Sequence, residues 1–166
     1  MSGHTTQVIK DLKEKSILVS REFDAGVELV WRAFTEREIL DQWWGPAPWR
    51  AKTKYQDFSV GGYWLYAMIG PENEKSWGRM NYLSIDVHRN FHLEDLFCDE
   101  EGNPNLDLPA SKGSIVFTST STGTRVDFKM NYSTEEQVHK LIEMGFEQGI
   151  TTCLEQLNQL IIHHKI

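Results

Sequence analysis

The stretch STEEQVHKLIEMGFEQGITTCLEQLNQLII, residues 133–162, decides the fold class of this chain. Ser133 and Glu136 have the S-x-x-E spacing of a capping box, and no proline follows them to the end of the chain. We therefore expect one continuous helix of about 28 residues, near 40 Å long, whose apolar face must pack across a sheet. Steps of three and four residues, typical of one helical face, join Val138, Ile142, Phe146, Ile150, Cys153, Leu157 and Leu160.

The chain before this helix has the sequence patterns of β-strands. Two short amphipathic helices, at residues 27–34 and 36–43, are expected after the first strand, and a Gly- and Pro-rich loop follows them. The later strands follow one another without crossover helices, so the sheet should be antiparallel and the class α+β. Alternating or β-branched runs predict strands at residues 16–23, 49–56, 63–69, 76–87, 90–98, 114–121 and 124–132.

The domain organisation is expected to be simple. The length of 166 residues suits one domain, and no internal repeat, low-complexity tract or second boundary is present. Residues 16–164 are predicted to form this single domain. Residues 1–15 are polar and charged, and are predicted to be a mobile leader or a short irregular start.

Charge and composition exclude several function classes. The chain has 17 basic and 24 acidic residues, a net charge of −7, which argues against binding nucleic acid or an anionic membrane. No apolar run is long enough to span a membrane, and the polar start is not a signal peptide. Two cysteines, Cys98 and Cys153, define no disulfide framework, so we expect reduced thiols and a cytoplasmic location. No sequence motif for a metal or a cofactor is present, and none is expected.

Several linked motifs resemble one protein family. VWRAFT at residues 30–35 and LDQWWGP at 40–46 are similar to a signature of the START-like superfamily, also called Bet v 1-like or SRPBCC. The branch they resemble is named after the C-terminal domain of the activator of Hsp90 ATPase. Asp57 with Gly61-Gly62, Gly78, FCDEEG at 97–102, GTRV at 123–126 and MGFEQG at 144–149 also match this branch.

The resemblance covers about residues 16–162 and has two departures. Ser59 stands where the family has an arginine, and residues 86–89 lack the usual proline. The resemblance implies a helix-grip fold, in which a curved antiparallel sheet of about six or seven strands wraps around the long C-terminal helix. It also implies an apolar cavity between sheet and helix.

The inward faces of the strands and of the long helix would line such a cavity. Aromatic and methionine side chains suit an apolar small molecule, although the same side chains could simply fill the core. We therefore expect a small soluble domain that binds a hydrophobic molecule of unknown identity. The net charge of −7 leaves an uncharged ligand as the simplest choice. The candidate ligand-binding residues are Tyr55, Trp64, Tyr66, Met68, Met80, Tyr82, Phe117, Phe128, Met130, Phe146 and Ile150.

One acidic residue shares this predicted inward face. Asp95 is in register with Phe91, Leu93 and Phe97, so burial would raise its pKa and make it an acid–base candidate or a ligand anchor. The strand could instead twist outward, or Arg79 or Lys112 could pair with Asp95. An enzyme of the polyketide cyclase or dehydratase type, found among relatives, is the alternative to a non-catalytic binding protein.

Four further questions stay open at the level of sequence. Gly145 and Gly149, four residues apart, indicate close helix packing or space at a cavity mouth. Trp43, Trp44 and Trp49 would either tie the short helices to the sheet or form a lid or partner surface. The family name allows an Hsp90-linked interaction module with a role in stress response, and an exposed edge could make a homodimer.

Overall fold

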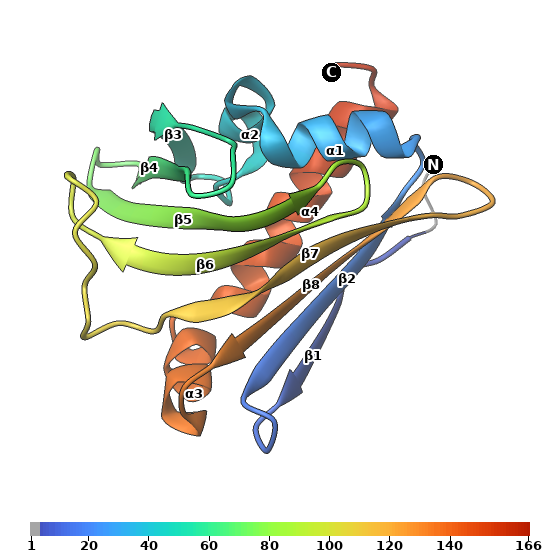
Figure 1. Cartoon of the computed structure of the whole chain (residues 1–166). Coiled ribbons are helices and arrows are strands. Elements are labelled where there is room, and N and C mark those ends of the chain that lie inside the picture. Colours follow the sequence, from blue (N-terminus) through green and yellow to red (C-terminus); the bar gives the residue numbers. More distant parts are fainter. Residues whose placement is uncertain (1–3) are drawn as a thin grey trace.

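The computed structural model describes residues 4–166, which form one eight-stranded antiparallel sheet and four helices (Figure 1). The predicted α+β class and helix-grip arrangement are confirmed. The helices are α1 (Val27–Thr35), α2 (Arg37–Trp43), α3 (Glu135–Glu143) and α4 (Phe146–Ile162). The strands are β1 (Gln7–Asp11), β2 (Ser16–Phe23), β3 (Arg50–Gln56), β4 (Tyr63–Ile69), β5 (Lys75–Asp86), β6 (Asn90–Cys98), β7 (Ser111–Ser119) and β8 (Thr124–Tyr132).

The strand order is β1-β2-β8-β7-β6-β5-β4-β3, so the last strand pairs with the second. Strands β3 to β8 form a meander in which each strand pairs with the next. The sheet is curved, and α4 runs across its concave side (Figure 1). Helices α1 and α2 lie at one end of this layer, and α3 lies at the other end.

The sheet has one strand more than the sequence indicated. Residues 7–11, expected in a mobile or irregular leader, form β1 and pair with β2 from Gln7↔Ser20 to Asp11↔Ser16. Strand β1 was missed because only two of its residues, Val8 and Ile9, are apolar, and most of the strand is exposed at the sheet edge. Residues 1–3 of the expected leader lie outside the described part.

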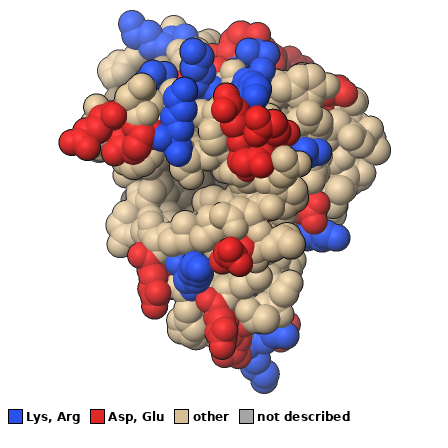
Figure 2. Space-filling view, turned by 90° about the vertical axis from the view of Figure 1, so that its left-hand side faces the viewer, with Lys and Arg blue, Asp and Glu red and all other residues tan. Residues whose placement is uncertain are grey.

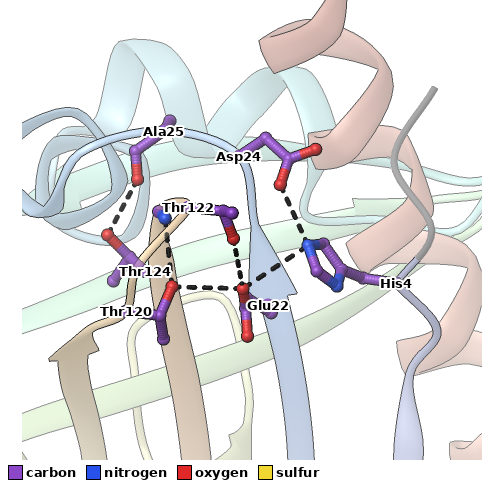
Figure 3. Close-up of polar contacts among 8 residues, drawn as sticks. His4, Glu22, Asp24, Ala25, Thr120, Thr122 and Thr124 are labelled. Atoms are coloured by element: carbon purple, nitrogen blue, oxygen red, sulfur yellow. Dashed lines mark hydrogen bonds and ion pairs between the residues drawn. The ribbon is translucent and has the colours of Figure 1, made fainter.

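Polar contacts dock the segment before β1 onto the end of β2 (Figure 3). His4 Nε2 lies 2.9 Å from Asp24 Oδ1 and 3.5 Å from Glu22 Oε2. The same Glu22 oxygen accepts hydrogen bonds from the hydroxyl groups of Thr120 and Thr122, in the β7–β8 turn. The start of the described chain is therefore tied to two parts of the sheet.

The predicted continuous C-terminal helix is wrong, because it breaks into α3 and α4 at Gly145. This glycine has φ +89°, in the left-handed region, and its N–H donates to the carbonyl of Ile142 as in a helix C-terminus. The capping residue is Thr134 rather than Ser133: its hydroxyl accepts from Gln137 N. The apolar period of three and four residues continues through the break, which is why the pattern hid it.

Aromatic side chains close the end of the concave face that α1 and α2 cover. Phe34 of α1 lies edge-on to Trp43 of α2, with ring centroids 4.9 Å apart, and to Phe117 and Phe128 of the sheet, each at 5.5 Å. Trp43 is fully buried and donates its indole N–H to the carbonyl of Ala33. This end of the interior is therefore solidly packed.

The two glycines at the start of α4 should respond differently to alanine. Gly145→Ala places a Cβ on a left-handed residue and should lower the free energy of unfolding by about 1 kcal/mol. Gly149 is helical, and a Cβ there would meet only Pro46 Cγ at 3.7 Å, an ordinary contact. Gly149→Ala should therefore leave stability unchanged or raise it by up to about 1 kcal/mol.

Urea unfolding of the two variants beside the wild type measures this difference. A Gly145→Ala variant as stable as the wild type would contradict the left-handed break between α3 and α4.

Candidate functional site

A cavity of about 510 Å³ lies between α4 and the part of the sheet that α1 and α2 do not cover. Figure 2 shows a hollow in one face of the molecule, bordered by uncharged residues, with charged groups above and below it. The apolar lining comes from strands β2 and β4 to β8, from α3 and α4, and from loops. The residues on its lining include Ile17, Val19, Met68, Met80, Leu93, Phe97, Ile115, Phe128, Met130, Leu141, Phe146, Ile150 and Cys153.

Gly78 on β5 has no side chain, and this leaves room for the ring of Tyr66 on the cavity lining. Gly78 lies between Tyr66 of β4 and Phe97 of β6 in one cross-strand row. A Cβ on Gly78 would come within 2.6 Å of the phenol end of Tyr66. The phenol end of Tyr66 therefore occupies the space over Gly78, where any larger residue would displace it.

The loop from Trp44 to Trp49 forms one side of the cavity, and Gln156 of α4 holds it in place. The Gln156 side-chain oxygen accepts from Ala47 N at 2.9 Å. Its amide donates to the carbonyls of Trp43, at 3.0 Å, and Gly45, at 2.8 Å. One side chain therefore satisfies three backbone groups of the loop, whose Trp44, Pro46 and Trp49 line the cavity.

Asp95 is the one acidic or basic side chain among the cavity-lining residues of the described chain. Its register partners are Met80 on β5 and Ser111, the first residue of β7. Neither Arg79 nor Lys112 forms an ion pair with it within residues 4–166. Burial raises the pKa of the Asp95 carboxyl to about 7, and a hydrogen bond from the Leu96 backbone offsets only part of this effect.

Two tyrosines lie on the same inner face near Asp95. Burial, reinforced by the charge of Asp95, raises the pKa of both Tyr66 and Tyr132, while Ser111 partly offsets the effect on Tyr132. Burial likewise raises the pKa of Cys153 on α4 to about 11. At neutral pH these three groups therefore keep their protons, and the cavity offers phenol donors around one carboxyl group.

The structure brings together seven of the eleven predicted lining residues. Tyr66, Met68, Met80, Phe128, Met130, Phe146 and Ile150 all line the cavity, as does Asp95. That these residues bind a ligand stays a prediction, since the structure shows only where they lie.

Four predicted lining residues lie elsewhere. Tyr55 is 44% exposed on the outer face, because a β-bulge after Thr53 shifts the alternation of β3. Trp64, Tyr82 and Phe117 do point inward, but they are fully packed. Trp64 stacks on Tyr66 at 4.2 Å, Tyr82 packs on Phe58 at 4.7 Å, and Phe117 packs on Trp31 at 5.0 Å.

Sequence reasoning missed several aromatic residues of the cavity. The sequence offered Trp44 and Trp49 as structural ties between the short helices and the sheet, or as a lid or partner surface. It did not propose Trp77 or Tyr132 as lining residues. All four line the cavity. The alternation of β8 could have indicated Tyr132, which follows Phe128 and Met130 at every second position. The loop tryptophans have no periodic pattern that could have indicated them.

Two kinds of feature are not found in residues 4–166. No group of three or more His, Cys, Asp or Glu side chains is arranged to hold a metal ion in this part of the chain. No helix of the same residues is long and apolar enough to cross a membrane.

Comparison with known proteins identifies a family model and several similar solved structures. The family model described as activator of Hsp90 ATPase homolog 1-like protein matches residues 24–161. A crystal structure of a protein from Mycobacterium smegmatis is 32% identical, covering 93% of this chain and 95% of its own, with TM-score 0.86. A solution structure from Arthrobacter aurescens is 31% identical, covering 95% and 91%, with TM-score 0.89. A protein from Nitrosomonas europaea is 29% identical, covering 92% and 97%, with TM-score 0.78. No curated protein matches the chain.

The carboxyl of Asp95 should make stability depend on pH in a defined direction. Its pKa is about 7 in the folded protein against an ordinary 3.8, so between these values the native state binds more protons than the unfolded state. The free energy of unfolding therefore falls as pH rises through this window. Over the two pH units from 5 to 7 the loss is roughly 2 kcal/mol.

Asp95→Asn removes this titration and keeps the shape of the side chain. Between pH 5 and pH 8 the variant should gain roughly 3 kcal/mol on the wild type in urea unfolding. A stability difference that stays constant across this range would contradict the unpaired position of Asp95 on the cavity lining.

Proposed function

This chain belongs to the activator of Hsp90 ATPase homolog 1-like family, and we propose that it binds a hydrophobic small molecule between the sheet and α4. The observation that carries this proposal is the cavity of about 510 Å³, which lies within the size range of small-molecule sites. Its lining is mostly apolar, with a few polar groups gathered around Asp95, as in sites that orient a ligand by one end.

An unfilled apolar cavity lowers the stability of a protein, and this supports the proposal that a ligand occupies it. Protein interiors are close-packed, and unfilled apolar space forfeits dispersion contacts along the whole lining. The fold spends stability on this space, because α1 and α2 pack one end of the concave face solidly while the other end stays open. The four methionines of the lining, Met68, Met80, Met130 and Met144, are unbranched and can adapt to the shape of an occupant.

The mouth of the cavity offers a route for entry. Met144 is 49% exposed, and Ser76 and Trp77 at the start of β5 reach both the cavity and the surface. An apolar molecule can therefore reach the interior without unfolding of the sheet.

A specific observation also favours a second candidate, an enzyme of the cyclase or dehydratase type. A carboxyl group whose pKa is near 7 can both give and take a proton at neutral pH. Phenol groups of Tyr66 and Tyr132 on the same face could stabilise charge on a substrate oxygen. The Hsp90-linked alternative rests on the family name alone.

An apolar dye tests the binding proposal. N-phenyl-1-naphthylamine, which is uncharged and fluoresces strongly only in apolar surroundings, should bind with one molecule per chain. Met68→Trp puts a large ring into the cavity and should weaken dye binding at least tenfold. Val116→Trp, on the exposed face of β7, serves as the matched control and should leave binding unchanged. Equal binding by all three proteins, or none by the wild type, would refute the proposal.

Mass spectrometry of the protein purified from its own host separates binding from catalysis. Under native conditions we expect a complex with one small molecule, released intact when the protein is denatured. Incubation of the wild type with the recovered molecule should leave its mass and its chromatographic retention unchanged if the protein only binds. Conversion by the wild type, lost in Asp95→Asn, would instead establish the enzyme.

A further inference from the structure

We propose that the molecule bound in this cavity carries a single protonated amine, and that this amine pairs with Asp95. The inference rests on the proposed function, because it names the chemical class of the ligand at the same site. It also replaces the expectation of an uncharged ligand with that of an apolar body bearing one cationic end.

The first step in the argument is the isolation of Asp95. Its carboxyl is the one acidic or basic group among the described cavity-lining residues. The nearest cations on neighbouring strands are engaged elsewhere or face away. Arg79 donates to Asn81 Oδ1 and to the carbonyl of Gly102, and lies 3.9 Å over the Tyr63 ring. Lys112 is exposed on the outer face. A carboxylate inside an apolar cavity is costly without a countercharge.

The second step concerns where a countercharge could come from. Within residues 4–166 no lysine, arginine or histidine lines the cavity, so the protein itself supplies none. In the empty cavity a proton can neutralise the carboxyl. A ligand amine would satisfy it better, since a charge-assisted hydrogen bond adds to the neutralised charge.

The third step is the aromatic surroundings. Asp95, Ser111 and Tyr132 form one cross-strand row, and Tyr66, Gly78 and Phe97 form the next row on the same face. Ring faces attract ammonium groups, most strongly where water is excluded. A carboxyl group bordered by rings on the lining of an apolar cavity has the chemistry that recognises an organic cation.

The groups that face Asp95 leave its titration simple. Tyr66 on β4, Tyr132 on β8 and Cys98 on the same strand interact electrostatically with it. Cys153 on α4 lines the same cavity. Each has a raised pKa and stays neutral at pH 7. Amine binding should therefore require only that Asp95 loses its proton, and it should strengthen as pH rises from 6 to 8.

Three ligands of equal chain length test this inference by displacing N-phenyl-1-naphthylamine: decylamine, 1-decanol and decanoate. At pH 8 decylamine should displace the dye at about one-tenth the concentration of 1-decanol, as expected for one charge-assisted hydrogen bond. Decanoate should be the weakest of the three. The preference for the amine should shrink at pH 6, where Asp95 is protonated.

Asp95→Asn should bring the amine and the alcohol to equal potency, while 1-decanol keeps its wild-type affinity within about twofold. This retained affinity also shows that the variant folds. The comparison of the wild type at pH 6 and pH 8 tests the inference even if the variant does not fold. Alcohol binding as tightly as amine in the wild type would overturn the amine inference and leave the proposed function intact. So would an amine preference that persists in Asp95→Asn. Failure of the dye to bind the wild type would overturn both.

Discussion

The antiparallel pairing of β2 with β8 is the constraint on which the rest of the molecule depends. It joins the second strand to the last, from Ser16↔Asn131 to Phe23↔Thr124. Helices α1 and α2 leave the far end of β2, whereas α3 and α4 follow the opposite end of β8, because the two strands run in opposite directions. Both helix pairs must therefore cover the same concave face from opposite ends, and the site lies where their coverage is incomplete.

Local patterns predicted most of the fold. The antiparallel α+β class followed from strands without crossover helices, and alternation placed β8 and β6 correctly. The features that failed are non-periodic. The break at Gly145 does not interrupt the apolar spacing from Ile142 to Phe146, and the bulge after Thr53 reverses the side of Tyr55 without any unusual residue.

Alternation also predicted the candidate site only in part. It distinguishes the inner face from the outer face, and it put Tyr66, Met80, Asp95 and Met130 on the inner face. It cannot show how far along a strand the helices pack. Tyr82 therefore has the same pattern as Met80, yet packs beneath Phe58 in the solid end of the interior. The loop that carries Trp44 and Trp49 is held to α4 by Gln156, which bonds backbone groups of Trp43, Gly45 and Ala47 more than 100 positions away in sequence.

That contact has a consequence for how such a protein can diversify. Gln156 binds backbone groups of residues 43–47, and backbone groups are common to every amino acid. The side chains at positions 44 and 49 can therefore change without loss of the hydrogen bonds that hold the loop. How the loop is anchored and which molecule the cavity prefers are separable traits, so natural selection could alter the second while the first stays constant.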